Sequence, residues 1–481
     1  MFLSTFVSKT SFLSNKSLSV PNALVRGKKT ITKKFILLLS ILSVCTISRA
    51  QDTTVYKLRL QSPVLDVPQN FNPASRFPSM NQSLEWSNDL YEAGFWGIDE
   101  LGDKLFKPKD KPYSKFRKFS NNLFKYAVSL GFSKYGSELP IPLGVWGHEE
   151  FHRSVLAVND ISAKNGNWML NRWDGTVYGV TDSLLTKLKA NNVNELLYSY
   201  VAGVQYEVAL NQKTSINDFY KKRSLAKNAL LLYNAYYVYN YFSFSTSAFT
   251  DTVKKLAPPH ENKISAERDF AGADLTAWAY DMFNPTTPFT TRDSFPNGEG
   301  VNRRVGFSDL SPEAQSFLVE QKKLSLLNFL NPAIFFVNRI NINRNFSFNF
   351  FTQYSPTHFG NAISVYVPFK YKKINALFNI HNYNNKSVSG YGVGVGLYHL
   401  PFTKKIETDI TLNVWDQPES FLDTKKSIGR LVTIKASYFF NKNWSAFVSA
   451  TKKSKGWVIG NPYLNDNVSF QTGFAFNLVK Q

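Results

Sequence analysis

Two histidines four residues apart are the part of this sequence best suited to chemistry. The segment 147–153 reads Gly-His-Glu-Glu-Phe-His-Arg, and the whole chain of 481 residues contains only six histidines. On a helix, positions i and i+4 lie on one face, so the imidazoles of His148 and His152 can hold one metal ion between them. Glu149 would then reach a metal-bound water and take its proton. The spacing predicts a Zn²⁺ site with Glu149 as the catalytic base.

The pattern His-Glu-X-X-His resembles that of the zincin metallopeptidases. The resemblance covers His148 to His152, and it implies a third protein ligand and a coordination position left open for water. The version with a third histidine six residues after the second is absent, because position 158 is Val158. The resemblance is therefore to the gluzincin-like version, in which a glutamate on a following helix completes the ligand set.

Glu207 is the residue that best matches this third ligand. It shares one face of a predicted helix with Leu196, Tyr200 and Gly203. A carboxylate on an apolar face needs a buried partner, and a glycine lets a neighbouring helix approach closely. Asp274 and Asp269 are the alternatives, either as the third ligand or as acids that orient a ligating histidine. Both acids could equally be helix N-terminal residues favoured by the helix dipole.

Two different periodicities divide the chain near residue 340. From 84 to 340, apolar residues recur at three-to-four spacing, which predicts a mostly helical domain that carries the motif. From 341 to 481 they alternate with polar residues, as in the segments 363–370 and 406–414. About eight such strands predict an antiparallel, eight-stranded β-barrel of the outer-membrane type. A soluble sandwich with one wet face would show the same alternation. The predicted fold class is α+β.

The first fifty residues have the pattern of a secretory signal peptide. A basic patch precedes the apolar run 35–44, and Ser48-Arg49-Ala50 ends the segment with a cleavage pattern. Cys45 is the only cysteine of the chain and lies in this segment. The alternative to an ordinary signal peptide is a lipoprotein with its lipid attached at Cys45. Residues 51–83 contain four prolines at near-even intervals and predict an irregular linker.

The charge balance indicates an anionic partner. The formal net charge is +21, and the first fifty residues hold eight basic residues and no acids, so +13 remains after their removal. This surplus suits anionic lipid at an outer membrane, whereas nucleic acid fits poorly with export. The sequence thus predicts an exported, outer-membrane-associated zinc-dependent hydrolase, most concretely a metallopeptidase that acts on peptides or proteins. The alternatives are a non-enzymatic outer-membrane barrel protein whose motif is structural or degenerate, and a soluble secreted protein with a β-sandwich tail.

Overall fold

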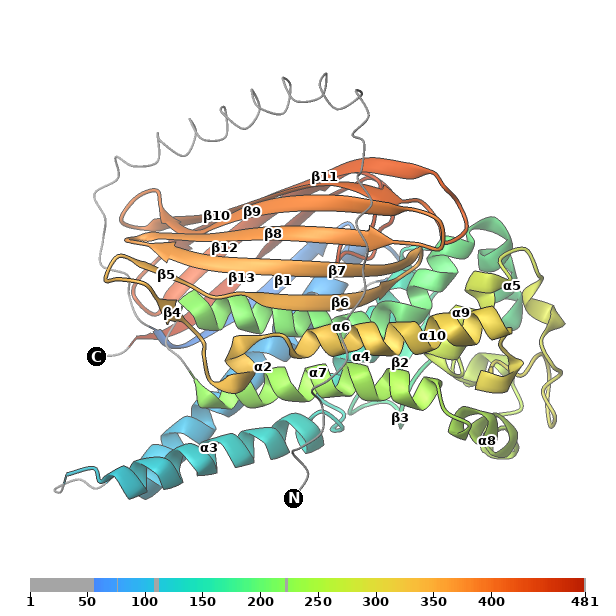
Figure 1. Ribbon diagram of the computed structural model, residues 1–481, viewed down its shortest axis with the longest axis horizontal. Helices are drawn as coiled ribbons and strands as arrows, with labels where there is room; N and C mark the ends of the chain where they lie inside the picture. The colour runs from blue at the N-terminus through green and yellow to red at the C-terminus, as the bar shows by residue number, and fades with distance from the viewer. Residues whose placement is uncertain (1–55, 76, 108–111, 221–223, 480–481) are drawn as a thin grey trace, which may run out of the picture. The chain divides into compact units, whose positions relative to one another are not determined.

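The computed structural model describes residues 56–479, apart from 76, 108–111 and 221–223. The predicted signal peptide 1–50, with Cys45, lies outside the described residues. The chain from Gln51 to Gln481 forms one compact unit. It combines helices with a large antiparallel sheet, so the α+β class is confirmed (Figure 1).

The described part of the chain contains nine α-helices, most of them where the three-to-four spacing predicts them. They are α2 (Met80–Phe106), α3 (Lys115–Gly136), α4 (Gly144–Ala157), α5 (Asp182–Asn191), α6 (Val193–Tyr220), α7 (Leu225–Ser245), α8 (Phe249–Leu256), α9 (Asp274–Phe283) and α10 (Pro312–Ser325). Within the described residues, no helix is both long enough and apolar enough to cross a membrane. A short hairpin of β2 (Lys164–Asn167) and β3 (Trp173–Tyr178) packs against α4.

Helix α6 is the central element of the helical part. Of its 28 residues, 21 are buried, which is typical of a helix enclosed by protein on all sides. Helix α4 packs along it and is also almost entirely enclosed, with 12 of its 14 residues buried. The motif 148–152 therefore lies inside the helical layer and not on its surface.

The sheet has eleven strands among the described residues, and apart from β1, which lies beside β13, neighbouring strands follow the sequence closely. The strands are β1 (Tyr56–Val67), β4 (Ile340–Asn341), β5 (Phe346–Phe348), β6 (Phe351–Thr357), β7 (Gly360–Tyr371), β8 (Ile374–Asn384), β9 (Ser389–Pro401), β10 (Ile406–Pro418), β11 (Lys426–Phe439), β12 (Trp444–Lys453) and β13 (Asn467–Val479). Their order is β1-β13-β12-β11-β10-β9-β8-β7-β5-β4, and β6 also pairs with β7. All of these pairs are antiparallel.

The sheet curls strongly but does not close. Arg59 on β1 lies 3.8 Å from Glu407 on β10, although three strands separate β1 from β10 in the order. Strands that far apart in a flat sheet would be about 19 Å from each other, so the sheet must bend back on itself. No ladder joins β1 to β4 or β6 among the described residues. The prediction of an eight-stranded barrel is therefore wrong in strand number and in closure.

Helices cover both edges of the open sheet. At the β6 edge, the Asn328 side chain accepts the backbone N–H of Tyr354 at 2.9 Å, and the Gln205 side chain on α6 donates to the carbonyl of Pro356 at 2.7 Å. At the β1 edge, the Asp89 carboxylate on α2 accepts the backbone N–H of Gln61 at 2.6 Å. Edge strands expose unpaired backbone groups, and here helix side chains satisfy them.

Strand β1 corrects the prediction that residues 51–83 form an irregular linker. It pairs with β13, although the two strands stand at opposite ends of the sequence. Pro63 lies within β1, opposite Gly473, and the pairing register shifts directly after it. Proline is tolerated in a sheet at an edge strand or a bulge, and β1 offers both.

The two faces of the curled sheet carry opposite kinds of side chain. The outward side chains of β8–β13 are apolar and exposed, and each strand supplies at least one: Ile380, Val393, Val414, Ile434, Val448 and Phe470. Their neighbours in sequence point into the curl and are mostly polar. A cavity of about 220 Å³ on this inner side is lined by residues such as Thr433, Ser449, Thr451 and Gln471. This distribution is the reverse of that of a sheet in a water-soluble protein.

Glu195, at the start of α6, provides a test of this packing. Burial raises the pKa of its carboxyl to about 7, although the Asn159 side chain donates to it at 3.2 Å and opposes the shift. A carboxyl with a raised pKa in the folded state stabilises the protein fully below its unfolded pKa, and this stability is lost as the pH rises through about 7. We compare the unfolding free energy of Glu195→Gln with that of wild type. The difference should shift in favour of the variant by roughly 2–3 kcal/mol as the pH rises from 5 to 8.5.

Denaturant unfolding at the two pH values measures this difference. The control is Glu320→Gln on α10, an exposed carboxyl for which wild type and variant should keep a constant difference. An equally constant difference for Glu195→Gln would contradict the prediction.

Candidate metal centre

His148 and His152 lie on the same face of α4 and turn toward α6. Their ring centroids are 4.9 Å apart, and both side chains are almost fully buried. They lie directly against Gly203 of α6, where an added Cβ would overlap the Nε2 atoms of both rings. Gly203, which shares a helix face with Glu207, does permit a close approach. The side chains that approach it are those of His148 and His152.

Asp274 completes a group of three possible metal ligands. It is the first residue of α9, and its Oδ2 atom lies 3.5 Å from His148 Nε2 and 3.3 Å from His152 Nε2. The three donor atoms lie within 4.8 Å of one another. Two donors held by one tetrahedral zinc ion lie about 3.3–3.6 Å apart, and the two separations from Asp274 Oδ2 match that range.

Glu207 lies on the other side of the His148 ring. Its carboxylate accepts the Nδ1 hydrogen at 3.3 Å, while Nε2 of the same ring faces Asp274. His152 repeats the arrangement, because its Nδ1 donates to the backbone carbonyl of Ser199 at 2.6 Å. Because an α6 acceptor faces Nδ1 of each ring, the neutral form of each imidazole would carry its lone pair on Nε2. Of the predicted third ligands, Asp274 therefore faces both Nε2 atoms, whereas Glu207 contacts His148 only at Nδ1.

The charges of the centre are strongly coupled. Burial alone would raise the pKa of Asp274, but the two imidazoles outweigh it and hold that pKa well below its usual value. Burial would likewise lower the pKa of His148, but Glu207 and Asp274 outweigh it and raise that pKa well above its usual value. Burial raises the pKa of Glu207, against the opposing effect of His148. Acidic groups outnumber the imidazoles, so the centre favours an added positive charge.

Glu149 stands beside this group with its carboxylate free of hydrogen bonds. It is 7 % exposed, and no donor among the described residues bonds to it. Burial raises the pKa of Glu149 well above its usual value, His148 opposes that rise, and the nearby acids Asp269, Asp274 and Asp174 add to it. A carboxyl group with a raised pKa and no fixed hydrogen-bond partner is suited to exchange a proton with a neighbouring group.

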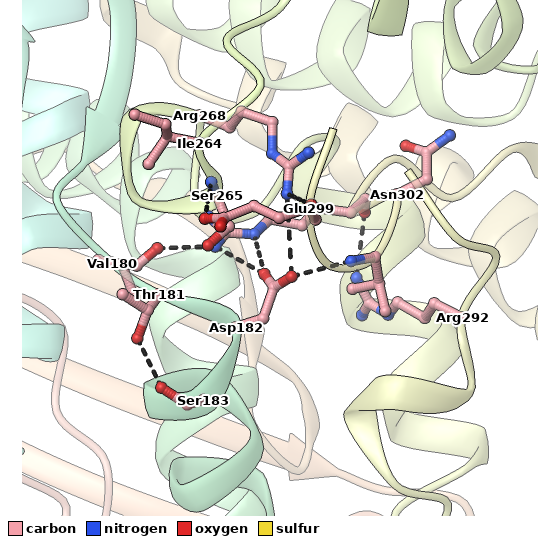
Figure 2. A network of polar contacts seen from close by, with 12 residues as sticks. Val180, Thr181, Asp182, Ser183, Ile264, Ser265, Arg268, Arg292, Glu299 and Asn302 are labelled. Carbon is pink, nitrogen blue, oxygen red and sulfur yellow. Dashed lines mark hydrogen bonds and ion pairs between the residues drawn. The ribbon is translucent and has the colours of Figure 1, made fainter. Parts of the chain in front are cut away.

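Asp269 shapes the loop before α9 and does not join the three ligand atoms. Its carboxylate accepts the backbone N–H of Gly272 at 2.7 Å. The loop is fastened from behind by Arg303, whose guanidinium donates to the Asp269 carbonyl at 3.0 Å and to the Asp182 carboxylate. Asp182, at the start of α5, is the hub of the polar network in Figure 2 and also accepts the Val301 N–H at 2.8 Å. This network fixes the loop from which Asp274 starts α9.

Helix α4 is anchored on its opposite side by a buried ion pair. The Arg153 guanidinium donates to Glu150 at 2.6 Å and to the Ser75 carbonyl at 2.8 Å. The Asn165 side chain on β2 donates to the other Glu150 oxygen at 3.0 Å. Glu150 and Arg153, the charged residues of α4 that do not face the centre, therefore hold the helix in place.

Two tyrosines of α7 belong to the centre and were missed by the sequence reasoning. The Tyr241 hydroxyl donates to Asp274 Oδ2 at 2.6 Å, and the rings of Tyr237 and Tyr241 lie 6.0 and 5.6 Å from the His148 ring. With Tyr233 they form a ladder at four-residue intervals along α7. That spacing was visible in the sequence, but nothing there showed which helix the ladder would face.

Comparisons with known proteins add little to this geometry. No family model and no curated protein matches the chain. Among solved structures, the chain resembles one described as "NanC porin structure in rhombohedral crystal form", with a TM-score of 0.23 and 8 % identity. The match covers 29 % of this chain and 74 % of that chain.

Gly203 is the position at which the packing of the centre can be tested. Gly203→Ala places a methyl group against both imidazoles, which are enclosed and must be displaced. We expect its unfolding free energy to fall by about 1–3 kcal/mol, the usual cost of overpacking a core. The matched control is Gly97→Ala on α2, where an added Cβ meets no atom within 4 Å. The control should be neutral or stabilised by up to about 1 kcal/mol. Equal stability of the two variants, measured by denaturant unfolding, would contradict this account.

Proposed function

We propose that the protein is a zinc-dependent hydrolase, most concretely a metallopeptidase, that is seated in the outer membrane. The observation that carries the catalytic part is the convergence of His148 Nε2, His152 Nε2 and Asp274 Oδ2 in a buried, acid-rich group. Two imidazoles and one carboxylate are a donor set that zinc binds in catalytic sites, with the fourth position left for water.

The protein's own residues would divide the work as follows. His148, His152 and Asp274 would hold the ion, which when bound supplies a water of lowered pKa. Glu149 would accept the proton of that water and pass it to the leaving group. Glu207 and the Ser199 carbonyl orient the two imidazoles through their Nδ1 hydrogens, and Tyr241 orients the Asp274 carboxylate.

Metal content measured on a set of variants tests the ligand assignment. We expect one zinc per chain in the wild type and in Glu149→Gln, and none in His148→Ala or Asp274→Ala. Glu207→Gln should retain zinc with an affinity about 10–100-fold lower, because it loses only an orienting contact. Asp269→Asn is the control, since an amide oxygen can still accept the Gly272 N–H, and it should bind zinc like wild type.

Two outcomes would contradict the assignment. Loss of zinc in Glu207→Ala with full retention in Asp274→Ala would make Glu207 the third ligand. Iron in place of zinc would contradict the proposed hydrolase, because two histidines and one carboxylate also form the iron sites of non-heme oxygenases.

A structural metal site is the competing reading, and the burial of the centre favours it. His148 and His152 are 2 % and 1 % exposed, and closed sites are usually structural. The protein would then be a non-enzymatic outer-membrane protein. Cleavage of a peptide library distinguishes the two hypotheses. If the protein is an enzyme, Glu149→Gln should abolish cleavage and leave the zinc content unchanged. If the site is structural, the wild type should show no cleavage.

The seating in the membrane is supported by the reversed polarity of the sheet. Apolar side chains cover the outer face, and aromatic residues gather at the turns of one end, where they match the aromatic girdle of membrane barrels: Tyr371, Phe402, Phe440 and Trp444. In water, each large apolar side chain left exposed forgoes about 1.5–3 kcal/mol of burial energy. Lipid removes this penalty for the whole face at once.

Val448, in the middle of β12 and 60 % exposed, distinguishes lipid from water as the medium around this face. If the side chain of residue 448 faces lipid, Val448→Arg should lower the unfolding free energy of the protein in lipid vesicles by about 2–4 kcal/mol. The same substitution on a water-exposed surface changes stability by about 0.5 kcal/mol or less. Urea titration of the protein reconstituted in vesicles measures the difference. A small effect, together with recovery of the protein in the soluble fraction, would indicate a soluble secreted protein.

A further inference from the structure

The hairpin of α2 and α3 exposes an apolar stripe that a helix pair in water would bury. The apolar side chains of Phe116, Phe119 and Leu123 follow one another at helical spacing on α3 and are 77 %, 64 % and 56 % exposed. On α2, Leu101 and Leu105 are exposed in the same way. A helix on a soluble protein places such a stripe against the core, and here it faces away from the protein.

The contact between α2 and α3 combines aromatic pairs, such as Phe95 with Phe132 and Phe106 with Phe124, with a buried polar cluster near the joined ends. The Asn121 side chain of α3 is buried and donates to the Asp103 carboxylate at 2.9 Å and to the Tyr113 hydroxyl at 2.8 Å. Lys125 donates to Asp103 at 2.8 Å and lies 3.4 Å from Asp99. These polar side chains pair α2 with α3 near the joined ends. The apolar stripe of Phe116, Phe119 and Leu123 lies outside this contact and is exposed among the described residues.

The exposed apolar stripe is accompanied by a concentration of positive charge. Exposed basic residues gather at the joined ends of the two helices: Lys104, Lys107, Lys115, Arg117 and Lys118. Asp103 lies among them and is already engaged by Lys107, Lys125 and Asn121. Figure 1 shows α2 and α3 side by side, with these ends projecting away from the sheet.

We propose that the α2–α3 hairpin is a second membrane-contacting element, which lies in the interface of a bilayer rich in anionic lipid. Apolar side chains on one face and clustered basic residues beside them are the two features that interfacial helices use, the first to enter the acyl boundary and the second to contact anionic headgroups. The proposal does not depend on zinc or on hydrolysis. It concerns a surface separate from the outer face of the sheet.

Site-specific lipid quenching tests the proposal on the full chain. In a Cys45→Ser background, the introduced cysteine is the only one and can carry an environment-sensitive fluorophore. Three positions are compared: Phe119→Cys on the hairpin, Val448→Cys on the outer face of the sheet, and Asn297→Cys on an exposed loop. Each labelled protein is mixed with vesicles of phosphatidylethanolamine and phosphatidylglycerol that contain brominated acyl chains. We expect quenching at 119 and not at 297.

The position at 448 separates this proposal from the seating of the sheet. Quenching at 448 without quenching at 119 would overturn the hairpin proposal and leave the sheet in lipid. Quenching at 119 alone would support the hairpin and remove the sheet from the bilayer. If the probe at 119 is shielded only as the protein concentration rises, and brominated lipid does not quench it, the stripe contacts a second copy of the chain and the proposal fails.

Charge variants test the choice of anionic lipid. Lys115→Gln combined with Arg117→Gln and Lys118→Gln should weaken lipid contact of the hairpin roughly a hundredfold, seen as loss of quenching at 119 in phosphatidylglycerol vesicles. The matched control neutralises three exposed lysines elsewhere, Lys187, Lys263 and Lys323, and should leave the quenching unchanged. Equal quenching in pure phosphatidylcholine vesicles, insensitive to the triple variant, would overturn the anionic-lipid part of the proposal.

Discussion

The close contact between α4 and α6 determines where every other functional element can lie. It is made through a glycine on each helix: the ring of Tyr206 covers Gly147 on α4, and the two imidazoles cover Gly203 on α6. Side chains larger than hydrogen at these positions would force the helices apart, and the Nδ1 partners of both imidazoles, which α6 supplies, would move out of reach. The geometry of the centre is therefore a consequence of helix packing and not of the motif alone.

The same helix also determines the position of the sheet. Gln205 on α6 donates to the Pro356 carbonyl at the β6 edge, and Gln353 on β6 donates to the Val208 carbonyl of α6 at 2.8 Å. The Trp457 indole, from the segment between β12 and β13, donates to Gln205 at 3.1 Å. A buried backbone group without a partner costs about 1–3 kcal/mol, so an edge of this length needs such a neighbour. Helices thus occupy the place that further strands would fill in a closed barrel, and α6 connects the centre to the curl.

Local periodicity predicted the elements well, and long-range pairing limited the rest. The helices that carry the motif and the strands β7–β13 follow from spacings of three-to-four and two residues within each segment. Strand β1 could not be predicted in this way, because its partner β13 is far away in sequence and Pro63 signals a break. The failure of closure likewise depends on how the two edges meet the helices, which no local pattern records.

The third ligand shows the same limit at the scale of one ring. Glu207 was recognisable as a carboxylate on an apolar helical face beside a glycine, and it does contact His148, but at Nδ1. Asp274 offered a weaker signal, because an acid at a helix start has an ordinary explanation in the helix dipole.

The excess of buried acid can be balanced in two ways, and the geometry distinguishes them. Protons can neutralise carboxylates in almost any arrangement, as the raised pKa values of Glu149 and Glu207 show. A divalent cation requires more, namely lone pairs that converge on one point at the separations of a coordination shell. The two Nε2 atoms lie 3.5 and 3.3 Å from Asp274 Oδ2, at separations of that kind, while Glu207 and the Ser199 carbonyl contact the two Nδ1 atoms. The position of Asp274, more than the presence of the two histidines, is therefore what carries our proposal of a cation at this centre.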